Sequence, residues 1–133
     1  MVRTNKDAGI TETLAKFSAE LTYEDLTPEA VDWAKYLCLD FAGVTLSGST
    51  TPSAKTVVEA LEGIQRPGPS AIVGTSVRVL PEYAAMANGI AFHSVELDDI
   101  NNEASLHPGV VAYPTALAMA DMSEVNGRDF VSA

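Results

Sequence analysis

The stretch "LTPEAVDWAKYLCLDFAGVTLSG", residues 26–48, is the clearest helical segment of this chain. Thr27 is a suitable N-cap, Pro28 suits the first helical position, and Gly48 can end a helix. Between them, apolar and small side chains recur at spacings of three and four residues, at Val31, Ala34, Cys38, Phe41 and Thr45. This periodicity predicts a long amphipathic helix that buries one face, with Cys38 in the core.

Several shorter stretches on either side have helical character too. Residues 10–21 and 52–64 carry apolar residues at helical spacing, and residues 81–97 and 109–122 are apolar and rich in small residues. Residues 126–133 begin like one more helix. The segments "AIVG" and "VRVL", separated by "TS", predict a small β-hairpin near residues 71–80. The whole pattern indicates a mainly α fold.

The composition excludes several classes of function. The formal net charge of −10 disfavours binding to nucleic acid or to an anionic membrane surface, because both need a basic face. No apolar run is long enough to span a bilayer, and the first residues lack the apolar segment of a secretory signal. A single cysteine, Cys38, rules out an intrachain disulfide and a Cys-ligated iron–sulfur cluster. We therefore expect a cytoplasmic protein.

The segment "VELDDINNEASLHPG", residues 95–109, concentrates negative charge around a histidine. No Lys or Arg lies between Arg78 and Arg128. A charged loop between helices is most often simply solvated. Two features favour a functional site instead: crowded carboxylates resist simultaneous ionisation without a nearby positive charge, and the flanking segments are apolar.

His107 is the candidate general acid or base of this loop. Pro108 biases it towards an extended backbone at the entry to the next helix, so it could also serve only as a hydrogen-bonding group at the helix end. The negative charges of Glu96, Asp98 and Asp99 on the same loop would favour its protonated form. We expect His93, one turn before Glu96, to be a packed and hydrogen-bonded residue rather than a catalyst.

A metal site is an alternative interpretation of the same loop. The run "DDINNE", residues 98–103, resembles the aspartate-rich Mg²⁺-binding motif of helical terpenoid synthases, and carboxylate oxygens suit Mg²⁺. Zinc is less favoured, because only one histidine is a plausible ligand and no cysteine is near. The sequence has no nucleophile elbow, Walker loop or dinucleotide-binding glycine pattern.

Four blocks in consistent order resemble the N-terminal part of the MmgE/PrpD family. They are "LAKFSAELTYEDLTPEAVDWAKYLCLDFAGVTLSGS", "AIVGTSVRVLPEYAAMANGIAFHSVELDD", "SLHPGVVAYPTALAMAD" and "NGRDF". The family includes 2-methylcitrate dehydratase, cis-aconitate decarboxylase and an iminodisuccinate epimerase, which act on small polycarboxylates without a metal or organic cofactor. The resemblance implies a large helical domain followed by a smaller α/β domain, in a protein that forms homodimers.

On this resemblance, residues 1–133 are the N-terminal portion of the helical domain, and the α/β domain is absent. The apolar pair Phe130 and Val131, close to the last residue, also suggests a fragment. The expected function is part of a cofactor-independent lyase or isomerase that acts beside a carboxylate of a small polycarboxylate, inactive as this fragment. The alternatives are a non-catalytic helical subunit that pairs with a partner, and a Mg²⁺-dependent helical synthase.

The resemblance also assigns residues. The family segment Asp-Phe-Asp-Asp-Thr, followed by His-Pro, matches residues 96–100 and 107–108 of this chain. It implies catalytic roles for His107, Glu96 and Asp98 and a substrate-binding role for Asp99. Ile100 replaces the family's threonine, so Asn101 or its neighbour Asn102 is expected to bind substrate in its place. Lys, His and Tyr residues farther along the family's chain would complete the site.

Overall fold

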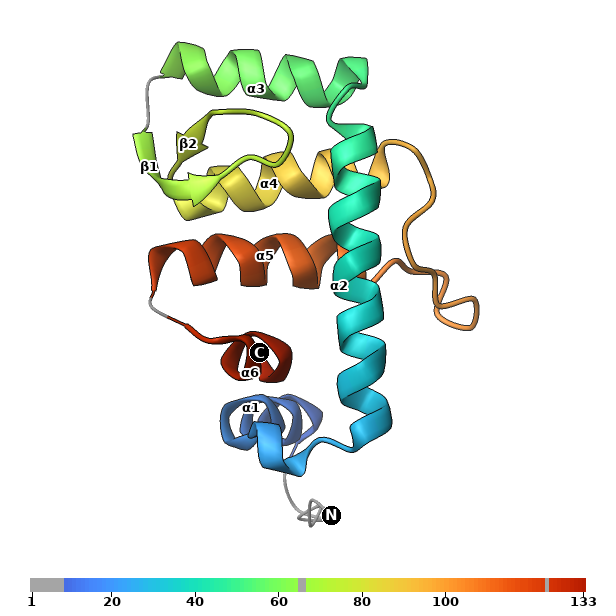
Figure 1. Ribbon diagram of the computed structural model, residues 1–133. Coiled ribbons are helices and arrows are strands. Elements are labelled where there is room, and N and C mark those ends of the chain that lie inside the picture. Colours follow the sequence, from blue (N-terminus) through green and yellow to red (C-terminus); the bar gives the residue numbers. More distant parts are fainter. Residues whose placement is uncertain (1–8, 65–66, 124) are drawn as a thin grey trace.

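The computed structural model describes residues 9–64, 67–123 and 125–133. It is mainly helical with one small hairpin, as predicted (Figure 1). The elements are α1 (Ile10–Glu20), a 3-10 turn (Tyr23–Asp25), α2 (Pro28–Gly48), α3 (Pro52–Ile64), β1 (Pro67–Ala71), β2 (Arg78–Val79), α4 (Pro81–His93), α5 (Gly109–Met122) and α6 (Gly127–Ser132). None of the described helices is both long enough and apolar enough to cross a lipid bilayer.

Helix α2 runs across the stacked helices α3, α4 and α5 (Figure 1). Its start follows the prediction, because the Thr27 hydroxyl accepts a hydrogen bond from the Ala30 N–H at 3.1 Å. Phe41 and Thr45 are buried on the predicted face. Cys38 is only partly buried, so its prediction as a core residue is wrong. It faces a shallow hollow beside α6, and its partial burial raises the pKa of its thiol.

Helix α1 forms where the sequence predicts it, but its apolar stripe remains largely exposed. Ile10 is 82% exposed, Leu14 60% and Phe17 43%, and the helix has no buried residue. Apolar periodicity predicts that a face avoids water but does not say which element covers it.

The hairpin lies over α4 and forms slightly earlier than predicted. Its first strand is residues 67–71 rather than 71–74, because residues 72–77 form the turn, which the Ile72 N–H closes on the Val77 carbonyl at 3.1 Å. The fully buried Asn88 side chain pins this turn to α4. It donates to the Ala71 carbonyl at 3.0 Å and accepts from the Val73 N–H at 2.9 Å.

Helix α4 packs against both α2 and α5, and small residues make this possible. A Cβ atom on Gly48 would lie 1.8 Å from the Ala91 carbonyl oxygen, so the two backbones meet without a side chain between them. Next to this contact, the Phe92 ring packs edge-on against Phe41 at 5.2 Å between centroids. The end of α4 is thereby fixed beside α2, and the residue after Phe92 is His93.

The contact at Gly48 gives a prediction about stability. We expect Gly48→Ala to lower the free energy of unfolding by about 1–3 kcal/mol, because an added methyl group must push α2 away from α4. Gly43→Ala is the matched control in the same helix, since a Cβ there meets nothing within 4 Å. It should raise stability by about 0.5–1 kcal/mol through helix propensity. Urea unfolding followed by circular dichroism measures both, and shifts of the same sign would contradict the prediction.

Candidate active site

Two histidines and one aspartate meet where α4 ends and α5 begins. The Asp98 Oδ2 atom lies 2.9 Å from the His93 Nδ1 atom and 3.0 Å from the His107 Nδ1 atom. The Asp98 side chain is fully buried, whereas the His93 side chain is 47% exposed and that of His107 is 31% exposed. The two imidazole rings lie 4.9 Å apart at 68° to each other. One buried carboxylate thus serves two partly exposed imidazoles.

The loop between α4 and α5 folds back so that its two ends lie close together. His93 is the last residue of α4, and His107 lies two residues before α5. Glu96 and Ser105 both adopt left-handed backbone conformations with φ of 52°, and Asn101 pairs with Leu106 in an isolated antiparallel bridge. These reversals bring the two ends of the loop together, although 13 residues separate the histidines in sequence.

The hydrogen bonds within this group are unequal. The contact from His93 to Asp98 has the geometry of a hydrogen bond. The contact from His107 has the right length, but the His107 Nδ1 atom makes no hydrogen bond within the described part of the chain. The Asp98 Oδ1 atom is also buried without a hydrogen-bond partner there. Unpaired buried polar atoms cost free energy. Two such atoms in adjacent side chains indicate a site that can bind a further proton or a polar ligand group.

The other predicted site residues lie apart from this group. Glu96 is exposed, and although its backbone N–H donates to the His93 carbonyl at 3.1 Å, no hydrogen bond or ion pair within the described residues joins its carboxylate to either imidazole. Asn101 is exposed at the tip of the loop, where its side-chain oxygen accepts from the Ala104 N–H at 2.9 Å. The structure therefore brings Asp98 and His107 together and leaves Glu96 and Asn101 facing solvent.

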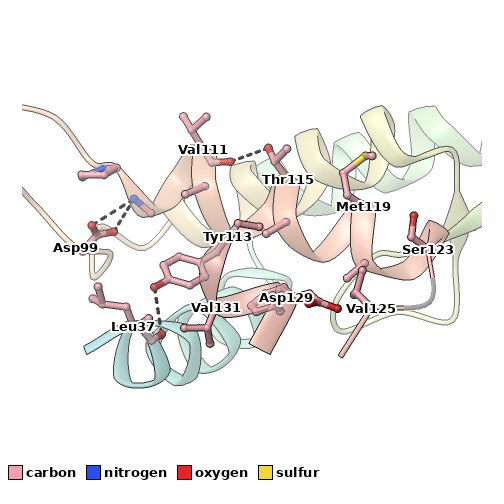
Figure 2. Close-up of a pocket in the computed structure, with 18 residues that line it drawn as sticks. Leu37, Asp99, Val111, Tyr113, Thr115, Met119, Ser123, Val125, Asp129 and Val131 are labelled. Carbon is pink, nitrogen blue, oxygen red and sulfur yellow. Dashed lines mark hydrogen bonds between the residues drawn. The ribbon is translucent and has the colours of Figure 1, made fainter. Parts of the chain in front are cut away.

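Asp99 sits at the first turn of α5. Its carboxylate accepts the Gly109 N–H at 3.0 and 3.3 Å, which satisfies a free donor at the positive end of the helix (Figure 2). A Cβ atom on Gly109 would lie 2.1 Å from the Asp99 Oδ1 atom, so the contact needs glycine at that position. Asp99 fixes where α5 begins and hence where His107 stands.

A cavity of about 620 Å³ lies on the other side of Asp99. Its walls come from α2, α5 and the segment around α6, and they are mainly apolar, with Leu37, Tyr113 and Met119 among them (Figure 2). The Tyr113 hydroxyl donates to the Ala34 carbonyl at 3.2 Å and ties α5 to α2. Such walls suit apolar side chains and offer little to a charged substrate.

The family match covers nearly the whole described structure. The model of the MmgE/PrpD N-terminal domain matches residues 12–133. This chain belongs to the MmgE/PrpD family.

Individual relatives in the family are longer proteins. A cis-aconitate decarboxylase of Aspergillus terreus is 27% identical over 124 residues, which cover 93% of this chain and 25% of the relative. The cis-aconitate decarboxylase-like protein oryM of Aspergillus oryzae is 31% identical over 96% of this chain and 28% of its own length. The human cis-aconitate decarboxylase is 30% identical over 84% and 23%. The chain thus spans about a quarter of these relatives, and no solved structure matches it significantly.

His93 is the member of the group that was not predicted from the sequence to belong to the site. It is hydrogen-bonded as expected, but its side chain is half exposed rather than packed. The sequence signal is a histidine in the last turn of a helix directly before an acidic loop. With His93 included, the nitrogen and oxygen atoms of the three side chains lie within 4.8 Å of one another, close enough to hold a metal ion. The objection that zinc would find only one histidine here therefore no longer applies in this MmgE/PrpD domain.

Tyr113 gives a prediction about alkaline pH. Burial, followed by the nearby Cys38 and Asp99, raises the pKa of Tyr113 above its ordinary value of 10.0. A raised pKa in the folded state means that the contribution to stability is complete below about pH 10 and disappears as the pH rises through the folded pKa. The effect is small, because the side chain is only partly buried.

We expect wild-type protein to lose more stability between pH 8 and about pH 11 than Tyr113→Phe does. At pH 8 the variant should itself be about 1 kcal/mol less stable, since the hydrogen bond to Ala34 is lost. Urea midpoints at the two pH values measure both effects. Tyr36→Phe, at an exposed position, is the control and should behave as wild type. An equal alkaline loss in wild type and Tyr113→Phe would refute this account.

Proposed function

We propose that this chain supplies part of the active site of a cofactor-independent lyase or isomerase that acts on a small polycarboxylate. His107 is the general acid or base, and Asp98 is the carboxylate that orients it. The observation that carries the proposal is the fully buried Asp98 side chain, 3.0 Å from the His107 Nδ1 atom. Several relatives are cis-aconitate decarboxylases, which supports the substrate class.

The arrangement suits proton transfer at carbon. In a decarboxylation, the bond between carbon and the departing carboxylate breaks, CO₂ leaves, and the electron pair that stays on the substrate takes a proton from the His107 imidazolium. In a dehydration, neutral His107 instead removes a proton beside a carboxylate, and the imidazolium gives it to the departing hydroxyl group, which leaves as water. In an epimerisation, the carbanion left by that removal takes a proton from water on its opposite face. In both directions the Asp98 carboxylate stabilises the positive imidazolium, as a buried aspartate does for histidine in a catalytic triad.

The substrate's own carboxylates need positive charge that this region does not offer. Residues 79–127 contain no Lys or Arg. We propose that cationic residues from the rest of the complete protein, or from a second subunit of a homodimer, cover the loop and bind these carboxylates. Glu96 and Asn101, which face solvent on the same loop, would then contact the substrate or the covering segment.

Replacing His107 in the complete protein tests the catalytic role. We expect His107→Gln to lower kcat for cis-aconitate by about 10²–10⁴-fold, the usual loss of a general acid or base, with an unchanged thermal unfolding midpoint. CO₂ release under substrate saturation measures it. Glu103→Gln, at an exposed position of the same loop, is the control and should lose little activity. Full activity of His107→Gln would make the loop a scaffold and end the proposal.

Residues 1–133 expressed alone should show no turnover of cis-aconitate, because the cations that bind the substrate's carboxylates would be missing. The control is the complete protein at the same molar concentration. Turnover by the short chain that disappears in His107→Gln would mean that the site is self-sufficient. The cationic part of the proposal would then be wrong, and the role of His107 would stand.

A further inference from the structure

Of the two histidines at the candidate site, His93 makes a hydrogen bond of good geometry to Asp98, and His107 does not. The His93 Nδ1 atom lies 2.9 Å from the Asp98 Oδ2 atom with good geometry, whereas His107 is equally near but not aligned. A buried carboxylate needs at least one aligned donor to have a defined orientation. Within the described residues, the only aligned donor to the Asp98 side chain is His93.

The position of His93 is itself well fixed. It is the last residue of α4, next to Phe92, which is 1% exposed and packed on Phe41. The carbonyl end of a helix also favours a donor or positive charge at that place. Asp98, in contrast, lies on a loop without regular secondary structure. A donor whose backbone is fixed by helix packing therefore holds a carboxylate that lies on an irregular loop.

We propose that His93 is a positioning residue, whose Nδ1–H holds the Asp98 carboxylate in the place from which that carboxylate orients His107. This inference rests on the proposed function of the site. His93 transfers no proton in the reaction. With Asp98 held still, the proton of neutral His107 stays on Nδ1, and the lone pair of its Nε2 atom is free to act on the substrate.

The tautomer of His107 gives a readout that needs no substrate. ¹⁵N NMR of the purified complete protein, at a pH where the imidazole is neutral, distinguishes the two tautomers. We expect mainly the Nδ1–H form in wild type and a mixture in His93→Ala. His93→Asn should keep the wild-type pattern, because its amide N–H occupies about the place of the Nδ1–H.

Ser94→Ala is the matched control for a purely structural effect. The Ser94 hydroxyl bonds the Ala91 carbonyl at 2.8 Å and lies 3.1 Å from the Thr51 hydroxyl, without reaching Asp98. We expect this variant to lower the unfolding midpoint and leave the His107 tautomer unchanged. An unchanged tautomer in His93→Ala, or the same tautomer change in Ser94→Ala, would overturn the proposal.

Kinetics of the complete protein with cis-aconitate give the second readout. His93→Ala should lower kcat by about 10–100-fold, the scale of misplacing a catalytic group by about 1 Å, with KM nearly unchanged. His93→Asn should recover most of that loss. An Asn variant as slow as the Ala variant would overturn the proposal, because the imidazole itself would then be needed. One equivalent of zinc in the purified protein, lost in His93→Asn, would overturn it in favour of a metal centre.

The two proposals fail in different ways. If His107→Gln retains full activity, the proposed function is wrong, whatever His93 does. If His107→Gln is inactive while His93→Ala keeps wild-type kcat and tautomer, only the positioning role of His93 is wrong.

Discussion

The close contact between α2 and α4 at Gly48 and Ala91 sets the positions of the other helices around the candidate site. A methyl group there would lie 1.8 Å from a carbonyl oxygen, so the angle and separation of the two helices are set by the absence of a side chain. Phe41 and Phe92 then pack beside the contact and bury the last turn of α4. Because α5 packs on the same helix, the start of α5 is placed against the end of α4, and the candidate site forms at that junction.

The carboxylates of the acidic loop do not form one cluster, because each has a different environment. Asp98 turns inward between the two histidines, and Asp99 accepts the Gly109 N–H at the start of α5. Glu96 is left exposed to water. Neighbouring carboxylates in sequence thus receive different partners in space, and their mutual repulsion is relieved by this division. The charge pattern of the sequence is real, but among the carboxylates of the described residues only that of Asp98 lies within 4 Å of a His107 nitrogen.

Local patterns were sufficient for the fold class and insufficient for the contacts. Helical periodicity predicted α2 with its Thr27 cap, because capping and the apolar face of a helix depend on residues that are close in sequence. It could not reveal that the stripe on α1 stays exposed, or that Asn88 pins the hairpin turn, since both depend on residues distant in sequence. The wrong prediction that His93 is packed has the same cause. The position of its partner, Asp98, depends on the conformation of an irregular loop, which has no periodic sequence pattern.

Distances favour a hydrogen-bonded acid–base group over a metal centre at this junction. Ligands around tetrahedral zinc, with bonds of about 2.0–2.1 Å, stand roughly 3.3 Å apart. Here the Asp98 Oδ2 atom is hydrogen-bonded to the nitrogen of His93 at 2.9 Å and lies 3.0 Å from that of His107, which is near enough for a hydrogen bond but not aligned for one, and both distances are shorter than the spacing of zinc ligands. A single oxygen at such distances from two imidazoles stabilises a proton on either ring. That property suits a reaction in which one histidine must gain and lose a proton while its surroundings stay in place.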